Sequence, residues 1–331
     1  MIERRGLLRG LACSAAVGVV GPARAAPPGA RLYRVGVLRA GSAPISPAEP
    51  QQVALPKALA ELGYAEGRNL VIERRHADND LARLPGLARE LVLARVDAIV
   101  AVGSSAVAAA KGASASVPIV MFGNFDPVAL GLVADLARPG GNVTGVLIAP
   151  DGTLAGKRLE LLKAAVPQAT RIGLLAPSDE AFRLQAQETR KAAALLGVTL
   201  VVVEVRNGDY AGAFAAMAAE RCTALLVGAH TYFVRDRRPI IELAAKYKLP
   251  AMFEWREQVV DGGFMSYSTN LYGLYRRIAA HLDHIFNGAS VGDIPVEQPT
   301  RFELVVNQKT ANALGITITP AFRLLIDEVI G

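Results

Sequence analysis

Runs of consecutive apolar residues recur along the chain and alternate with stretches of helical periodicity. The run YRVGVL at 33–38 is followed by NLVIERR, DAIVAV and VPIVMFG, and the stretches between them, such as SSAVAAAKGAS at 104–114, are typical of helices. Apolar runs without alternation indicate strands that are buried on both faces of a sheet. Strands that alternate with helices predict a parallel, doubly wound sheet.

The same order returns from Thr170 onward. The runs RIGLLAPSD, TLVVVEVRNG, TALLVGAH and LPAMFEW are separated by predicted helices. The sequence therefore predicts an α/β protein with two doubly wound parallel-sheet lobes. Lobe one is expected at 31–148 and lobe two at 149–267.

The C-terminal segment reads as strand FMSYS, helix LYGLYRRIAAHLDHIFNG, strand FELVVN and helix QKTANALG. Such a segment can return to both lobes, with part of 268–292 joining lobe one and part of 300–331 joining lobe two. The chain would then cross between the lobes near 148–152, 266–270 and 296–302. Several crossings of this kind predict a hinge that opens and closes.

The N-terminus has the pattern of a secretory leader. The stretch MIERRGLLRGLACSAAVGVVGPARA begins with basic residues, continues with an apolar run, and ends in Ala-Arg-Ala, which is a suitable cleavage site. We therefore expect residues 1–25 to be a signal peptide, exported by the Tat or the Sec route, and the mature protein to be periplasmic.

Composition narrows the class of protein. The chain has 331 residues, of which 52% are hydrophobic and 20% charged, which suits a globular protein of two domains. The leader carries a net charge of +3, so that only +3 of the formal +6 remains on the mature chain. A basic nucleic-acid binder is therefore not indicated.

In open α/β sheets, ligands bind beyond the carboxyl ends of the strands. The polar and aromatic residues that follow the predicted strands are therefore the candidates for a ligand site. In lobe one these are Ser42, Ser104, Ser105, Asn124, Phe125 and Asp126; in lobe two they are Ser178, His230, Glu254, Trp255 and Arg256.

Ser104 and Ser105 begin a predicted helix, and two roles are open for them. A serine oxygen can cap the helix, or the two hydroxyls and the free N–H groups can bind a carboxylate. A nucleophilic role has little support because GSSA is not the Gly-x-Ser-x-Gly elbow. The glycine-rich phosphate motifs are also absent.

The other candidates have similar alternatives. Asp126-Pro127 reads as the N-cap and first residue of a helix, although Asp126 or Glu254 could bind an ammonium group. Arg256 could hold a carboxylate through a forked pair of hydrogen bonds. Phe125 and Trp255 could enclose a flat apolar group from opposite walls. His281 and His284 lie three residues apart, but without an evident third ligand they are interpreted as surface residues, and no metal site is expected.

Longer stretches carry a family resemblance. The segments LAELGYAEGRNLVIERRHAD, LPGLARELVLARVDAIVAVGSSAVAAAKGASASVPIVMFGNFDPVALGLVADLARPGGNVTGV, LAGKRLELLKAAVP and PVEQPTRFELVVNQKTANALGI resemble the ABC transporter substrate-binding family that includes tryptophan- and tyrosine-type binding proteins. The resemblance implies a type I periplasmic-binding fold, no catalytic activity and no cofactor. It also implies pocket positions at Ser104, Ser105, Asp126, Arg256 and Glu257.

The resemblance further implies partners and a ligand class. We expect a monomer that captures a small carboxylate-bearing ligand, aromatic or amphipathic, such as an amino acid, and delivers it to an ABC permease in the inner membrane. The sequence departs from the family in GAHTYF, where His230 stands in place of the common Asp or Asn, and at Pro177-Ser178. The alternatives are a secreted serine hydrolase that uses Ser105 with His230, and a sensory ligand-binding protein.

Overall fold

The computed structural model describes residues 31–41, 50–149, 152–178, 182–206 and 208–331. Residues 31–331 form one compact unit, which contains two sheets. The predicted signal peptide and Ser42 lie outside the described residues. No helix in the described part of the chain has the length and apolar character needed to cross a membrane.

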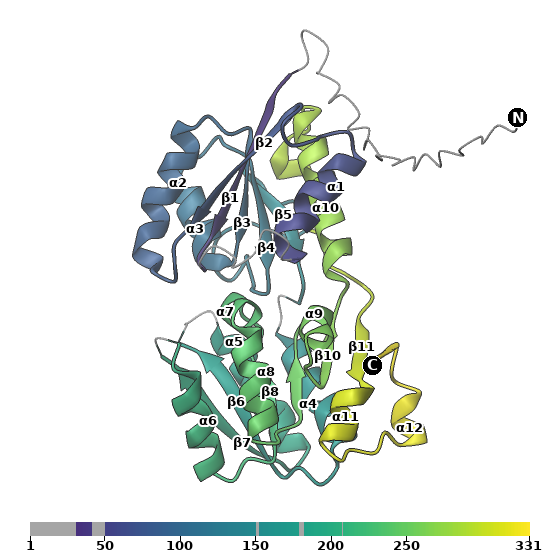
Figure 1. The fold of residues 1–331 in the computed structure, drawn as a ribbon. Helices are drawn as coiled ribbons and strands as arrows, with labels where there is room; N and C mark the ends of the chain where they lie inside the picture. The colour runs from purple at the N-terminus through teal and green to yellow at the C-terminus, as the bar shows by residue number, and fades with distance from the viewer. Residues whose placement is uncertain (1–30, 42–49, 150–151, 179–181, 207) are drawn as a thin grey trace, which may run out of the picture. The chain divides into compact units, whose positions relative to one another are not determined.

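The first sheet has five strands in the order β2-β1-β3-β4-β5, and all its pairs are parallel. Its strands are β1 (Tyr33–Arg39), β2 (Leu70–His76), β3 (Ala98–Val102), β4 (Ile119–Gly123) and β5 (Val143–Leu147). Its helices are α1 (Pro50–Glu61), α2 (Leu84–Leu93), α3 (Ser104–Ala113) and α10 (Leu271–Phe286). Helices α1 and α10 cover one face, while α2 and α3 cover the other (Figure 1). We call this assembly lobe one.

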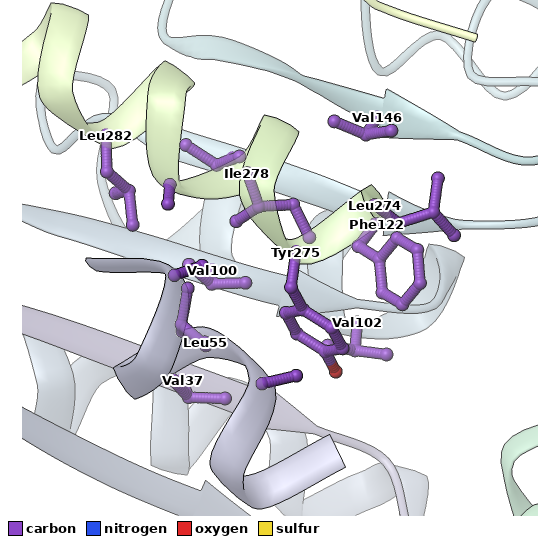
Figure 2. Packing of buried hydrophobic residues seen from close by; sticks show 14 of the residues in the cluster. Val37, Leu55, Val100, Val102, Phe122, Val146, Leu274, Tyr275, Ile278 and Leu282 are labelled. Atoms are coloured by element: carbon purple, nitrogen blue, oxygen red, sulfur yellow. The ribbon is translucent and has the colours of Figure 1, made fainter. Parts of the chain in front are cut away.

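Helix α10 comes from the C-terminal segment but packs in lobe one. Its apolar residues recur every three or four positions, which gives the helix one hydrophobic face. Figure 2 shows Leu274, Tyr275, Ile278 and Leu282 of this face against the buried residues of the sheet. The lobe is therefore completed by a segment that follows the whole of lobe two in sequence.

The second sheet has seven strands in the order β12-β11-β10-β9-β8-β6-β7. Its strands are β6 (Arg171–Pro177), β7 (Thr199–Val205), β8 (Ala224–Val227), β9 (Ala251–Phe253), β10 (Met265–Ser268), β11 (Glu303–Asn307) and β12 (Glu328–Ile330). The helices are α4 (Thr153–Ala165), α5 (Arg183–Leu195), α6 (Tyr210–Ala219), α7 (Thr231–Arg235), α8 (Arg237–Lys246), α9 (Arg256–Val260), α11 (Gln308–Ala313) and α12 (Pro320–Arg323). This assembly is lobe two. The 3₁₀ helices η1 (Leu81–Arg83) and η3 (Val291–Asp293) lie outside it, because η1 leads directly into α2 of lobe one and η3 contacts β5 of the first sheet.

Lobe two departs from a fully parallel sheet at one pair of strands. Strands β10 and β11 run antiparallel, with Met265 opposite Val306. The chain leaves lobe two after β10, forms α10 in lobe one, and returns as β11, so the returning strand runs in the opposite direction. The prediction of two doubly wound parallel-sheet lobes is confirmed, apart from the antiparallel pair β10–β11, which the sequence pattern did not predict.

The returning segment also contacts lobe one. Glu297 forms a bridge to Val146, and the N–H of Leu147 donates to the carbonyl of Glu297 at 2.9 Å. The chain thus passes between the sheets after β5, after β10 and again before β11. The crossing before β11 therefore runs beside β5, and a connection with several crossings is the kind that we predict to act as a hinge.

Candidate functional site

A cavity of about 110 Å³ lies where the carboxyl ends of the strands of both sheets meet. Seven of the predicted site residues line it: Ser104, Ser105, Asn124, Phe125, His230, Glu254 and Trp255. Each of these residues lies beyond the carboxyl end of a parallel strand, and the parallel strands of a sheet all end at the same edge. The cavity lies between these edges of the two sheets, so residues of both lobes line it. A ligand in this cavity would therefore contact both lobes.

The lobe-one wall is built around the start of α3. Gly103 is the N-cap of this helix, with φ of 90°, and Ser104 is already its first helical residue. The interpretation of the two serines as caps is therefore wrong, because glycine turns the chain one residue earlier and occupies the cap position. Neither serine hydroxyl has a hydrogen-bond partner among the described residues, and both line the cavity. The first N–H groups of a helix also lack intrahelical partners.

Asn124 and Phe125 follow β4 on the same wall. The Oδ1 atom of Asn124 is buried without a hydrogen-bond partner among the described residues. Phe125 is 6% exposed, and its ring covers Gly123. This part of the wall thus offers one polar group and one aromatic ring to a ligand.

Asp126 lies at a turn and not at the start of a helix. Its Oδ1 accepts the N–H groups of Val128 and Ala129 at 2.9 and 3.0 Å. The prediction of a helix after Pro127 is wrong, because Gly131 has φ of 66° and the chain leaves the helical conformation there. Asp126 lines an adjoining, more open depression of about 580 Å³, which shares with the cavity Ser104, Ser105, Asn124, Phe125 and Gln185.

His230 and Trp255 lie on the lobe-two wall. The Nδ1 atom of His230 accepts the N–H of Tyr232 at 3.3 Å, so this side chain caps α7. Trp255 precedes α9, and its backbone N–H donates to Oε1 of Gln258 at 2.8 Å. Trp255 is only 5% exposed. The side chain of His230 and the backbone of Trp255 are therefore each bonded to the helix that follows them.

Glu254 adds a buried carboxyl group to this wall. Its Oε1 lies 3.7 Å from Nη2 of Arg158, and the two side chains are 7% and 1% exposed. Burial raises the pKa of the Glu254 carboxyl, and the guanidinium of Arg158 opposes that rise. Burial likewise lowers the pKa of Arg158. Arg158 itself stands behind the wall on α4, where its Nε donates to the carbonyl of Tyr267 at 2.7 Å.

Sequence reasoning missed several residues of the cavity. Arg39 and Tyr275 line the lobe-one side, and Gln185 lines the lobe-two side. Arg39 is the last residue of β1 and could have been found by the same strand-end rule. Tyr275 and Gln185 lie on helices, where no strand-end signal exists. The amide of Gln185 is bonded to the backbone of Ala229, with distances of 3.1 Å to its carbonyl and 3.2 Å to its N–H.

The model of the family described as ABC transporter substrate binding protein matches residues 49–330. The chain belongs to this family. The substrate-binding protein is 27% identical over 261 residues to a tyrosine-binding protein of Clostridioides difficile (strain R20291), a match that covers 78% of this chain and 75% of that protein.

Two solved structures are also similar to this substrate-binding protein. One is an ABC domain from Streptococcus pneumonia in complex with L-Trp, and the other is a conserved domain protein from Vibrio cholerae. Each has a TM-score of 0.80 and 26% identity, and each match covers 90% of this chain and 100% of that chain. The fold is that of the type I periplasmic binding proteins, as the resemblance implied.

Two predicted site residues of the substrate-binding protein lie away from the cavity. Ser178 is exposed and lines a separate depression beside Pro177. Arg256 forms a forked pair with Glu328 of β12, with distances of 2.6 and 2.7 Å. Its guanidinium therefore already has a carboxylate partner, which comes from a strand that the sequence pattern did not reveal.

The interpretation of both C-terminal histidines as surface residues is wrong for His281. This side chain is 2% exposed, and its ring nitrogens lie 2.9 Å from the carbonyl of Arg277 and 3.2 Å from that of Pro295. The apolar face of α10 carries it inward toward the segment that returns to lobe two. His284 is exposed. Within the described residues no group of His, Cys, Asp and Glu side chains could hold a metal ion.

Proposed function

We propose that this substrate-binding protein is a receptor for a small ligand that carries a carboxylate and an aromatic or amphipathic body, such as an amino acid. The observation that carries this proposal is the composition of the cavity. Lobe one contributes a helix N-terminus with two free serine hydroxyls, and lobe two contributes Trp255. A ligand with a carboxylate at one end and a flat apolar group at the other fits both walls.

The start of α3 is the proposed carboxylate site. A helix N-terminus carries partial positive charge and free N–H donors, so it favours an anion. The hydroxyls of Ser104 and Ser105 add two neutral donors, and the guanidinium of Arg39 adds positive charge to the same cavity. Together these groups favour a carboxylate over an uncharged sugar.

The aromatic rings of Phe125 and Trp255 are the proposed contacts for the ligand body. Both line the cavity, one from each lobe, and both are almost completely buried. Each aromatic contact contributes about 0.5–1.5 kcal/mol beyond burial. The names of the relatives support this assignment, since one is a tyrosine-binding protein and another was crystallised with L-Trp.

The proposal also covers delivery of the ligand to a permease and export of the protein to the periplasm. Substrate-binding proteins of this family serve ABC transporters, so we propose an ABC permease of the inner membrane as the partner of a monomeric receptor. The leader pattern at 1–25 supports a periplasmic location. Neighbouring permease and ATPase genes would distinguish transport from a sensory role.

The geometry of His230 argues against the serine hydrolase. In a Ser-His-Asp triad, Nδ1 carries a proton that it donates to a carboxylate, and Nε2 accepts the serine proton. Here Nδ1 accepts the N–H of Tyr232 at 3.3 Å, so this nitrogen faces the start of α7 and does not donate to a carboxylate as it would in a triad. The chain is therefore proposed to be a binding protein and not an enzyme.

Calorimetry and thermal unfolding test the proposal with L-Trp and L-Tyr as probes. A ligand that binds only the folded protein stabilises it by about 2.7 kcal/mol at a concentration of 100 times Kd. We expect such stabilisation, with the ligand recovered unchanged. Tight binding only to uncharged sugars, or turnover of an ester that is lost in Ser105→Ala, would contradict the proposal.

A further inference from the structure

Phe182 contributes an aromatic ring to the lobe-two wall of the cavity. It is the N-cap residue of α5 and is 5% exposed. It lines the ligand cavity of about 110 Å³. It also lines the depression of about 340 Å³ beside Pro177. Phe182 therefore stands between the two, with the ligand cavity on one side and the depression on the other.

The ring of Phe182 rests on Gly228, which directly follows β8. A Cβ atom added at Gly228 would lie 2.6 Å from Cε2 and from Cζ of the ring, and 2.9 Å from the carbonyl oxygen of Leu175. Carbon atoms in favourable contact lie about 3.5–4.0 Å apart. The ring therefore occupies the space in which any other residue at position 228 would place its side chain.

The backbone under the ring is fixed by the sheet and by α5. The N–H of Gly228 donates to the carbonyl of Leu175 in β6 at 2.9 Å. The next residue, Ala229, has its N–H and its carbonyl bonded to the side-chain amide of Gln185, which lies in the first turn of α5. The start of α5 thus holds both the ring of Phe182 and the backbone on which it rests.

Lobe one has the same arrangement at Phe125. A Cβ atom added at Gly123, the last residue of β4, would lie 2.8 Å from Cε1 of the Phe125 ring. Phe125 lines the ligand cavity and also the open depression of about 580 Å³. In each lobe, an aromatic ring that rests on a glycine at a strand end thus lies between the ligand cavity and an outer depression.

A purely structural role is the alternative for Phe182, since it belongs to a hydrophobic cluster of lobe two that also contains Ala176 and Ala186. A side chain with only that role would be enclosed by its cluster. Phe264 of the same cluster is such a residue, because it is 1% exposed and lines neither the ligand cavity nor the depression. Phe182 differs from it because it lines both.

We propose that Phe182 determines how large a ligand body this receptor accepts. Its ring closes the lobe-two side of the ligand cavity, and Gly228 holds the ring in that place. Without the ring, the cavity of about 110 Å³ would continue into the depression of about 340 Å³. This inference rests on the proposed function, because it assumes that the ligand binds in this cavity. The excluded ligands are those whose apolar body extends past Phe182, whatever polar groups they carry at the other end.

The first test is calorimetry of Phe182→Ala with two ligands of different length. The probes are L-Tyr and O-benzyl-L-tyrosine, which differ only in the benzyl group on the hydroxyl oxygen. We expect the unmodified protein to prefer L-Tyr by at least about tenfold, because a small group that does or does not fit an apolar pocket changes affinity by about 10- to 200-fold. Phe182→Ala should lose or reverse this preference, since the benzyl group gains the space of the ring and of the depression.

The control is Phe264→Ala, which removes the same kind of ring from the same hydrophobic cluster without opening the cavity. Both variants should lose stability, so thermal unfolding must first show that each is folded at the temperature of the assay. The control should keep the preference of the unmodified protein. If Phe182→Ala does not fold, Phe182→Leu removes less of the side chain and should shift the preference in the same direction.

The second test needs no ligand. Trp255 is the only tryptophan of the chain, and it lines the ligand cavity while being only 5% exposed. Acrylamide that enters the cavity quenches the fluorescence of Trp255. If Phe182 closes the cavity toward the depression, the Stern–Volmer constant for acrylamide should rise in Phe182→Ala and stay unchanged in Phe264→Ala.

The role of Gly228 is tested by combining Gly228→Ala with Phe182→Ala. The added methyl group must push the ring by about 1 Å to restore an ordinary contact distance, so Gly228→Ala alone should weaken the binding of L-Tyr. When Phe182→Ala has already removed the ring, the same methyl group should have a smaller effect. Independent effects of the two changes would show that the ring does not depend on Gly228.

The outcomes separate this inference from the proposed function. If L-Tyr binds, and Phe182→Ala leaves both the preference and the quenching unchanged, the inference is overturned while the proposed function stands. If neither probe binds the unmodified protein, the proposed function fails for these ligands, and the quenching decides whether Phe182 closes the cavity.

Discussion

The guanidinium of Arg39 donates a hydrogen bond of 2.8 Å to the hydroxyl of Tyr275, which lies 236 positions later in the chain. The bond joins the end of the first strand to α10, the helix that the C-terminal segment adds to lobe one. Both side chains line the ligand cavity, and both are buried. The C-terminal segment therefore builds part of the binding site and does more than cover the sheet.

Replacing Tyr275 by Phe should destabilise the protein by about 1–3 kcal/mol. The change removes the acceptor of a buried, charged donor and keeps the aromatic ring, and hydrogen bonds to charged groups have about this value. Urea unfolding of the two proteins measures the difference. Tyr272→Phe is the matched control, because the Tyr272 hydroxyl bonds to Glu61 at an exposed position on the same helix. A loss of the same size in both variants would contradict the role of the buried bond.

The strand-end rule explains which parts of the site could be predicted. Apolar runs predicted the strands, and the direction of parallel strands brings Ser105 and Asn124 to one edge of the first sheet and Glu254 and Trp255 to one edge of the second. Tyr275 could not be found in this way, since its place depends on how α10 packs across the chain. Glu328, the partner of Arg256, could not be predicted either, because β12 is too short to give a recognisable strand pattern. Long-range packing of this kind leaves no local signal in the sequence.

Replacing Ser105 by Ala should weaken the binding of L-Trp or L-Tyr by about 1–3 kcal/mol. The loss follows if the hydroxyl is the donor to a ligand oxygen that is otherwise unpaired in the closed cavity. Calorimetry measures it. Ser178→Ala removes the same group from an exposed position outside the cavity and should leave the affinity unchanged. Equal affinities for all three proteins would exclude Ser105 from the carboxylate site.

Replacing Arg256 by Ala should lower stability by less than about 1 kcal/mol and leave ligand affinity unchanged. The side chains of Arg256 and Glu328 are 43% and 39% exposed, and such exposed pairs contribute little to stability. If Arg256 instead holds the ligand carboxylate, affinity should fall at least tenfold, which calorimetry would detect.

The same pair predicts a dependence on pH. Its hydrogen bond to Arg256 lowers the pKa of the Glu328 carboxyl in the folded protein. Its contribution to stability is therefore present at neutral pH and is lost as the pH falls through the folded pKa. The stability difference between the unmodified protein and Glu328→Gln should shrink in acid. A difference that stays constant down to pH 3 would contradict this.

Replacing Gly145 by Ala should destabilise the protein by more than about 3 kcal/mol, since both strain and a backbone clash are involved. Gly145 lies in β5 with φ of 148°, and an added Cβ would be 2.1 Å from the backbone oxygen of Met121. Gly112→Ala is the control, because this position in α3 has open space around it, and the change should stabilise by up to about 1 kcal/mol. Denaturant unfolding compares them, and a mild effect of Gly145→Ala would show that β5 can shift.

Ligand binding should draw the two lobes together. Each sheet is covered by helices on both faces, so each lobe should move as a nearly rigid body, and of the hydrophobic clusters the one under α1 and α10 also includes Val234 and Trp255 of lobe two. The crossings after β5, after β10 and before β11 are the only covalent connections between the lobes in the described residues, and the cavity is lined from both sides. A bound ligand that contacts both walls favours the closed arrangement over the open one.

We therefore expect the radius of gyration from solution scattering to fall when a saturating amount of a ligand with a confirmed Kd is added. The same titration with Ser105→Ala should require a higher ligand concentration for the same decrease. Identical scattering profiles with and without a tightly bound ligand would show that the hinge does not move on binding.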